Sequence, residues 1–167
     1  LIIIIRKVNV IMSFSYYDSE LGKIKIEVED KYIIGVNFVS DIDLPMDEIN
    51  NENEKSIISK CKNQLEEYFN GERKNFELEI KFIKGTNFQK CVWSELCKIN
   101  YGETLSYKQV AERIGKPNAY RAVGGANNKN PIAIIVPCHR VIGKNGAMVG
   151  YADGIDKKEF LLKLERK

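Results

Sequence analysis

The hydrophobic pattern of this 167-residue chain changes its period near the middle, and this change limits the folds open to it. Lys23–Glu29 alternates strictly between polar and apolar side chains, which is typical of a strand with one buried face. Ser13–Tyr17, Tyr32–Val39 and Phe76–Phe82 are also strand-like, whereas Glu54–Phe69 carries apolar residues at helical spacing. The first half therefore predicts an α/β unit with a small antiparallel sheet and one long helix.

The second half shows helical spacing instead. Four helices are expected, at Phe88–Ile99, Leu105–Ile114, Pro117–Ala126 and Asp156–Leu164. The second and third are short, and Gly115-Lys116-Pro117 between them has the turn chemistry of a helix-turn-helix. We therefore predict two domains, a structural α/β domain over residues 1–83 and a mostly helical domain over residues 84–167.

Charge is distributed unevenly between these halves. Residues 1–83 contain 11 Lys and Arg against 16 Asp and Glu, a net charge of −5, whereas residues 84–167 contain 15 against 7, a net charge of +8. A basic half can meet a polyanion such as nucleic acid, although ordinary surface charge gives the same excess. Hydrophobic residues make up 44% of the chain and charged residues 29%, which excludes a disordered protein.

The chain begins with an apolar run, Leu1–Ile5, that ends at Arg6-Lys7. The run is too short to span a bilayer, and it lacks the basic region and the cleavage site of a signal peptide. We expect it to form a buried strand of a cytoplasmic protein that has no membrane partner.

The sequence contains a single histidine and four cysteines, Cys61, Cys91, Cys97 and Cys138. The cysteines form no Cys-x-x-Cys pair, which argues against a zinc site, and nothing indicates secretion and disulfides. Cys91 and Cys97 lie in an apolar helical segment and are expected in the core, whereas Cys61 lies in a charged helix and is expected to be incidental. No metal and no cofactor are expected.

The segment Ile135–Gly143 places a polar cluster, Cys138-His139-Arg140, between two apolar flanks. Burial by these flanks makes a charged group costly unless it is paired. A reactive thiol needs a lowered pKa, which a histidine or a cation can supply, so one interpretation is a thiolate nucleophile with an attendant base. The residues alone are equally compatible with a structural cysteine beside a histidine packed in the core.

The segment Pro137–Val141 resembles the active-site signature of the O6-alkylguanine-DNA alkyltransferases. Further segments resemble those of this family, in the same order and at the same spacing. Tyr101–Tyr107 resembles the entry to the helix-turn-helix, and Arg121–Ala126 followed by Asn130-Pro131 resembles the recognition helix and the hinge. Gly150–Ala152 resembles the substrate loop. The resemblance covers about residues 86–165, while the first half matches only in its expected layout.

The resemblance implies a role for each residue of the active site. Cys138 would accept the alkyl group, and His139 would take the thiol proton through a water molecule, with Glu159 of the last helix behind it. Asn130 would hold the loop that positions this group. Arg140 would be structural, with its charge tied to nearby backbone or to a carboxylate.

The resemblance also implies which residues bind DNA. Tyr107 would press on the 3′ phosphate, turn the nucleotide outward and protonate the departing guanine, and Arg121 would fill the space left in the duplex. The helix would lie in the minor groove. Gly124 and Gly125 would let it approach the DNA backbone closely, with Ala119 at its beginning.

Recognition of the flipped base would depend largely on the protein backbone. The backbone of Cys138, Val141 and Ala152 would hydrogen-bond the base, and Tyr151 would form part of the alkyl pocket. The implied partner is double-stranded DNA containing O6-alkylguanine, and the implied protein is a monomer. Each molecule would act once, because no mild reaction removes the alkyl group from the thioether.

Two residues depart from the family's pattern. Asp153 stands where the family commonly has Gly, and a carboxylate there could narrow the pocket. Tyr120, immediately before Arg121, replaces what is often a small residue and could alter how the helix meets DNA.

Three other functions agree with parts of the sequence. A non-catalytic relative that binds alkylated DNA would lack the acceptor cysteine, which is present here as Cys138. A sequence-specific helix-turn-helix transcription factor would leave Pro137–Arg140 unexplained, and a cysteine hydrolase is the third alternative. The mass of the intact protein after incubation with alkylated DNA separates all of them.

Overall fold

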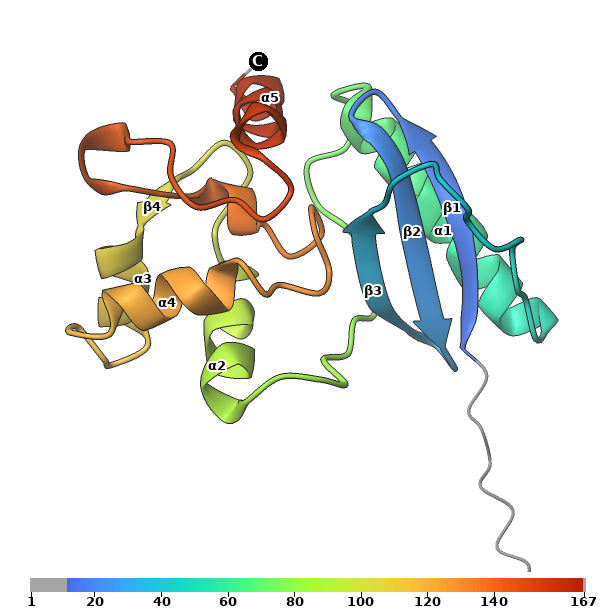
Figure 1. Ribbon diagram of the computed structural model, residues 1–167, viewed down its shortest axis with the longest axis horizontal. Helices are drawn as coiled ribbons and strands as arrows, with labels where there is room; N and C mark the ends of the chain where they lie inside the picture. The colour runs from blue at the N-terminus through green and yellow to red at the C-terminus, as the bar shows by residue number, and fades with distance from the viewer. Residues whose placement is uncertain (1–11, 167) are drawn as a thin grey trace, which may run out of the picture.

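The computed structural model describes residues 12–166, so the strand expected at Leu1–Ile5 lies outside the described residues. In the first half, β1 (Ser13–Ser19), β2 (Gly22–Glu29) and β3 (Tyr32–Phe38) form an antiparallel sheet in the order β1-β2-β3. The helix α1 (Glu52–Phe69) covers one face of this sheet (Figure 1). The expected antiparallel sheet with one long helix is confirmed.

The core of the first half lies between β2 and α1. Ile24, Ile26 and Val28 are fully buried at every second position of β2. They meet an apolar stripe of α1 formed by Ile58, Cys61, Leu65, Tyr68 and Phe69. Cys61 is therefore a core residue, and the expectation that it is incidental was wrong. Its spacing of three residues from Ile58 and four from Leu65 places it on the buried face despite the charged neighbours.

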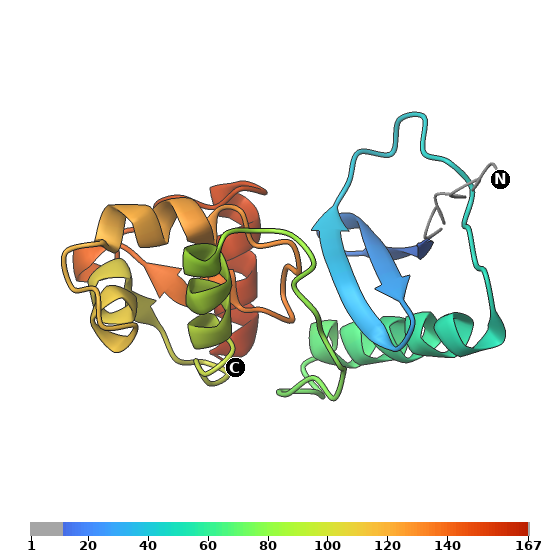
Figure 2. The ribbon, with the colours of Figure 1, turned by 90° about the horizontal axis from the view of Figure 1, so that it is seen from below.

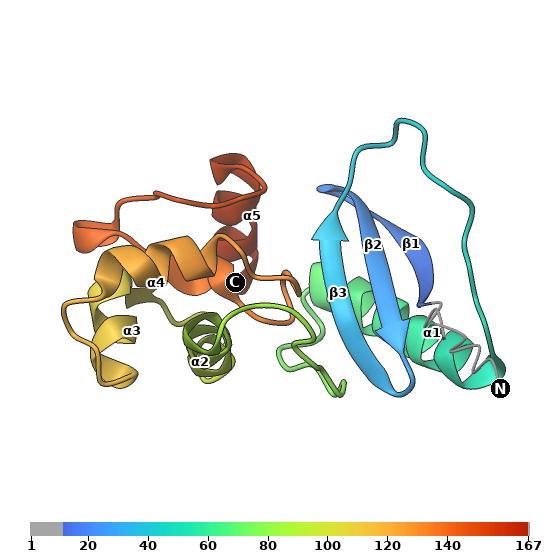
Figure 3. The ribbon, with the colours of Figure 1, turned by 60° about the horizontal axis from the view of Figure 1, so that its bottom comes forward.

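The strand β3 lies nearest the second half of the chain, and its free edge is shared by two other segments (Figure 3). One isolated bridge joins Ile33 to Ile80, and another joins Val36 to Ile132. The strand expected at Phe76–Phe82 was wrong, since that segment makes only the first bridge. The second bridge brings a loop of the other half onto the same edge, which leaves no room for a longer pairing.

The second half is mostly helical, as expected, and lies beside the first half with a long connection between them (Figure 2). Its helices are α2 (Asn87–Leu96), α3 (Tyr107–Arg113), α4 (Tyr120–Asn127) and α5 (Ile155–Glu165). Two short parallel strands, β4 (Leu105–Ser106) and β5 (Val141–Ile142), pair with each other. Among residues 12–166, no helix combines the length and apolar character needed to cross a membrane.

The helix-turn-helix consists of α3 and α4. Ser106 and Gln109 form a reciprocal capping box that starts α3, because each side chain accepts a hydrogen bond from the other residue's backbone N–H. Gly115 ends this helix with a φ of +71°, a conformation that costs glycine little. The next helix begins at Tyr120, three residues after the expected start at Pro117.

The helix α2 follows the connection between the two halves and supports α4. Its buried side chains include Val92, Trp93 and Leu96, whereas Cys91 and Cys97 are exposed, so the expectation of core cysteines at both positions was wrong. The buried face follows the spacing of the large apolar residues, and the two cysteines lie beside it.

Trp93 fixes α2 against both neighbouring segments. Its Nε1–H donates a buried hydrogen bond of 2.8 Å to the carbonyl of Ala126 at the end of α4, and its ring packs 5.2 Å from that of Phe82. A Cβ atom at Gly85 would lie 2.5 Å from this indole, and Gly85 has a φ of +100°. Glycine is therefore required at this position of the connection.

Candidate active site and DNA-facing surface

Cys138 lies in a single turn of 3-10 helix, Cys138–Arg140, which follows Pro137 and precedes β5. The pairing of β5 with β4 brings this turn close to the beginning of α3, where Tyr107 is located. Cys138 is only 5% exposed, so an electrophile must enter the protein surface to reach its sulfur.

Asn130 holds the loop that leads to Cys138. Its Nδ2 donates to the carbonyl of Val136 at 2.8 Å, and its Oδ1 accepts from the backbone N–H of Ile132 at 3.0 Å. Asn127, at the end of α4, donates through Nδ2 to the carbonyl of Cys138 at 3.2 Å. Two side-chain amides therefore fix the loop and connect the cysteine to the helix-turn-helix.

His139 is fully buried and is held by Glu165, not by Glu159. The distance from His139 Nε2 to Glu165 Oε1 is 2.8 Å. Glu159 is exposed, and no hydrogen bond joins it to His139 among the described residues, so the role assigned to it from the sequence was wrong. Glu165 lies on the buried face of α5, four residues after Leu161 and three after Leu162, and this helical spacing is the sequence signal that could have placed it on that face.

Arg140 balances the charge of this buried carboxylate. Its Nε donates to Glu165 Oε2 and its Nη2 to Oε1, both at 2.9 Å, which is a bidentate ion pair. Its Nη1 donates to the carbonyl of Ile99. The structural role expected for Arg140, with its charge tied to backbone and a carboxylate, agrees with these contacts.

Burial dominates the electrostatics of Cys138. It raises the pKa of the thiol to about 11, while a hydrogen bond with Asn130 and the charge of Lys158 act in the opposite direction. The pKa of His139 is lowered, again mainly because burial disfavours its charged form. In the protein without DNA, burial therefore opposes the lowered pKa that a reactive thiol needs, and it favours the neutral form of both the cysteine and the histidine.

Lys158 is a residue of the site that the sequence did not identify. It is fully buried on α5, and its Nζ donates to the carbonyl of Val149 at 2.9 Å. Desolvation lowers the pKa of Lys158 to about 8, and the electrostatic interaction with Cys138 partly offsets this decrease. Asp153 is half-buried near the same cysteine, and burial raises the pKa of its carboxyl. The departure from the family's glycine therefore places an ionisable group close to the thiol.

Two tyrosines approach Cys138 from different elements. Tyr151 is 8% exposed, and burial and the neighbouring Cys138 raise the pKa of its hydroxyl. Tyr107, at the first position of α3, donates to the carbonyl of Val149 at 2.9 Å and lies near enough to interact electrostatically with the thiol. Val141 is fully buried in β5 beside Cys138, while Ala152 is exposed in the following loop.

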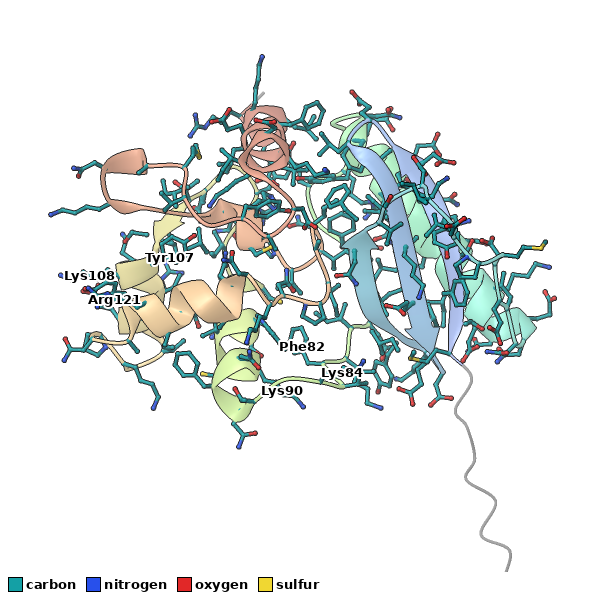
Figure 4. The ribbon with its side chains drawn as sticks, viewed as in Figure 1. Phe82, Lys84, Lys90, Tyr107, Lys108 and Arg121 are labelled. Carbon is teal, nitrogen blue, oxygen red and sulfur yellow. The ribbon has the colours of Figure 1, made fainter. Side chains whose placement is uncertain are left out.

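The residues expected to bind DNA gather at the end of the second half that is farthest from the sheet. Figure 4 shows Tyr107, Lys108 and Arg121 together there. Arg121 is exposed in the first turn of α4, and Tyr120 beside it is 45% exposed. A methyl group at Gly125 would meet no atom within 4 Å, so this face of α4 is open.

The remaining two residues expected at this surface lie at the margins of the open face. Ala119 is the residue that precedes α4, and no side chain caps the helix there. Gly124 faces Tyr107, whose ring would lie 3.8 Å from an added Cβ, an ordinary contact. The helix α4 therefore begins without a side-chain cap, and its open face carries the exposed Arg121 near the buried cysteine.

A helix-turn-helix joined to a buried Cys-His-Glu cluster and to a small antiparallel sheet defines a class of DNA-repair proteins. The chain belongs to the 6-O-methylguanine DNA methyltransferase family. The model of the family's DNA binding domain matches residues 87–167, and that of its ribonuclease-like domain matches residues 12–82.

Curated relatives carry the name methylated-DNA–protein-cysteine methyltransferase. That of Methanosarcina barkeri is 51% identical over 156 residues, which are 90% of this chain and 96% of the relative. That of Mycolicibacterium paratuberculosis is 43% identical over 150 residues, 90% of each chain. The solved structure of Mycobacterium tuberculosis OGT in complex with DNA superposes with a TM-score of 0.80 at 40% identity and covers 92% of both chains.

Proposed function

We propose that this chain repairs DNA by moving a methyl or larger alkyl group from O6 of guanine to Sγ of Cys138. A bond forms between sulfur and the alkyl carbon, and the bond from that carbon to O6 breaks with its electron pair going to oxygen. The thiol proton leaves to His139, and the departing guanine regains a proton from Tyr107. The single observation that carries this proposal is the buried contact of His139 with Glu165 beside Cys138.

The direction of proton transfer follows from the hydrogen bonds of His139. Nε2 lies against a carboxylate oxygen, which only accepts, so Nε2 carries the hydrogen and Nδ1 has the free lone pair. Nδ1 is buried and has no hydrogen-bond partner among the described residues. It is therefore available to receive the thiol proton of Cys138, through one water molecule. The neutral thiol and the neutral histidine are the correct starting states for this transfer.

Burial of the acceptor also supports nucleotide flipping. A sulfur that is 5% exposed cannot reach O6 of a guanine stacked in a duplex, so the nucleotide must turn out of the helix. Tyr107 and Arg121 lie on the surface next to the cysteine, where one can displace the nucleotide and the other can fill the gap that it leaves. The partner is double-stranded DNA bound through the minor groove.

The reaction consumes the protein, because water does not hydrolyse a thioether under mild conditions. The second half (residues 84–167) carries the acceptor and the DNA surface, and the first half (residues 1–83) supports it. The protein acts as a monomer and needs no cofactor, because every group in the reaction comes from its own side chains or from the DNA.

The test is to incubate the protein with a duplex containing O6-methylguanine and to weigh it intact. One methyl mass is expected on Cys138 and none on Cys61, Cys91 or Cys97, as peptide mapping would show. Cys138→Ser should bind the same duplex without gaining mass, since a hydroxyl is a far poorer nucleophile near neutral pH. A methyl group on another cysteine would exclude Cys138 as the acceptor, and binding without transfer by the unmodified protein would favour the non-catalytic alternatives.

A further inference from the structure

The carboxylate of Glu165 is fully buried and accepts five hydrogen bonds, one of which comes from the first half of the chain. Oε1 accepts from the hydroxyl of Tyr68 at 2.7 Å, from His139 Nε2 at 2.8 Å and from Arg140 Nη2 at 2.9 Å. Oε2 accepts from Arg140 Nε at 2.9 Å and from the backbone N–H of Gly102 at 3.1 Å. The same oxygen that holds His139 is therefore also held by Tyr68.

We propose that Tyr68 is a positioning residue for alkyl transfer, through which the first half sets the basicity of His139. The inference rests on the proposed function, in which His139 takes the proton of Cys138. Tyr68 is near the end of α1, 97 residues from Glu165 in sequence, and its contacts are with Glu165 and with neighbouring aromatic rings. It acts only through the carboxylate.

The surroundings of Tyr68 fix the direction of its hydroxyl. The residue is fully buried, and its ring packs against those of Phe69, Phe76 and Tyr101 at centroid distances of 5.6, 5.5 and 6.1 Å. A ring held on several sides cannot swing its hydroxyl to another acceptor without repacking the core. The bond to Glu165 is therefore a preset feature of the junction between the two halves.

This bond changes the charge that His139 meets. A hydroxyl that donates to Oε1 draws negative charge away from that oxygen, so the oxygen stabilises an imidazolium less strongly. Without the hydroxyl, Oε1 would interact more strongly with the Nε2–H of His139, and the pKa of the histidine would rise. The histidine would then be protonated, and unable to accept the thiol proton, over a wider range of pH.

The other groups around His139 keep their places when only this hydroxyl is removed. Arg140 lies on the same turn and Lys158 on α5, and both charges lower the pKa of His139. The hydroxyl of Tyr101 donates to the backbone carbonyl of Leu164 at 3.3 Å and not to the carboxylate. Cys138 is neutral, because its pKa is raised to about 11.

The experiment compares full-length wild type with Tyr68→Phe. Single-turnover rates of methyl transfer from an O6-methylguanine duplex are measured between about pH 5 and 8, and the titration of the single histidine is followed by NMR. The acid limb of the pH–rate profile is the fall in transfer rate at low pH, where His139 becomes protonated. In Tyr68→Phe the midpoint of this limb and the histidine pKa should both move up by about half to one unit, so transfer at a pH on this limb slows about three- to tenfold. DNA affinity should not change.

Two further variants make the outcome decisive. Tyr101→Phe also removes a tyrosine hydroxyl next to the site but takes no bond from Glu165, so its acid limb should match that of wild type. Replacement of Tyr68 by 3-fluorotyrosine keeps the ring and makes its hydroxyl a stronger hydrogen-bond donor to Glu165. This replacement should therefore move the acid limb of the pH–rate profile to lower pH. The fluorinated protein also provides the test if Tyr68→Phe fails to fold.

The results separate the two proposals. Wild type that transfers no methyl group to Cys138 would overturn the proposed function itself. Wild type that transfers normally, together with Tyr68 variants whose acid limb and histidine pKa are unchanged, would overturn the role of Tyr68 alone. A uniform loss of rate at every pH without a shift of the midpoint would show that Tyr68 serves only to support the fold.

Discussion

Cys138 and His139 are adjacent in sequence, and burial acts on both in the same direction, toward the neutral form. The raised pKa of the thiol and the lowered pKa of the imidazole leave little thiolate in the free protein. A nucleophile of this kind is protected from small electrophiles in solution, and it becomes reactive only when a bound substrate and a proton acceptor are both in place.

This leads to a prediction about alkylation by iodoacetamide at about pH 7.5. Cys91 is exposed and should be labelled first, whereas Cys138 should react at least about tenfold more slowly, because it is buried and burial raises the pKa of its thiol to about 11. A time course with peptide mapping by mass spectrometry measures each site separately. Labelling of Cys138 before the exposed cysteines would show that its thiol is ionised and accessible.

At the scale of a single element, α5 determines which carboxylate enters the site. The helix turns Leu161, Leu162 and Glu165 inward and leaves Glu159 exposed. The inward carboxylate is fully buried and is paired with Arg140 and His139. Loss of its charge would leave a buried guanidinium without its partner, which is far more costly than the loss of an exposed charge.

Glu165→Gln and Glu159→Gln are therefore a matched pair of variants on one helix. Glu165→Gln should lower the free energy of unfolding by about 3–5 kcal/mol and abolish fast transfer, because the Arg140 charge is left uncompensated. Glu159→Gln should change stability by less than about 0.5 kcal/mol, as is usual for an exposed position. Urea titrations of both proteins test this, and equal losses of stability would contradict the assignment of Glu165.

The helix α4 carries the arginine proposed to fill the gap in the duplex. Arg121 is exposed in the first turn and contacts no part of the cysteine cluster. Arg121→Ala should slow transfer from duplex DNA by at least about tenfold, the equivalent of 1.4 kcal/mol, and leave transfer from the free modified base unchanged, because a free base needs no flipping. The rates of transfer from the duplex and from the free modified base, measured for Arg121→Ala and wild type, test this prediction. Equal loss on both would assign Arg121 a role in folding instead.

At the scale of the whole molecule, the two halves differ in charge and meet at a buried junction. The first half has a net charge of −5 and the second half +8. The proposed DNA surface lies at the end of the second half, away from the acidic sheet (Figure 4). The halves nevertheless share Glu165, which takes a hydrogen bond from α1 in the first half. The first half therefore lies away from the proposed phosphate contacts, but it contacts the active site through Glu165.

DNA affinity should fall steeply with salt and vary little with the sequence around the lesion, because phosphate contacts release counterions and do not read bases. The exposed Lys108 and Lys60 provide matched variants from the two halves. Lys108→Ala should reduce the slope of log affinity against log salt by about one, and Lys60→Ala, on α1, should leave it unchanged. A salt titration with each protein measures this. Strong preference for one base sequence would favour a transcription factor.

Much of the fold could be predicted, because it depends on local patterns. The strict alternation of β2 and the helical spacing of α1 and α5 describe single elements, and their types were confirmed. The strand at Phe76–Phe82 was wrong because pairing depends on a partner, and the edge of β3 is divided between two segments. Burial of Cys61 and exposure of Cys91 depend on which face of each helix is covered, and hydrophobic composition alone does not decide this.

In the active site, too, some features follow from the local sequence and others depend on tertiary packing. Cys138 and His139 are adjacent in sequence and Asn130 is eight residues before Cys138, so the chain itself keeps these three residues in one short loop. Glu165, Lys158 and Tyr68 reach the site through packing, and in the case of Tyr68 the bond to Glu165 spans 97 residues. Only the tertiary structure decides such contacts, because they require two elements to present particular faces to each other. It also decides the pKa of Cys138, since the burial that raises it comes from those same elements.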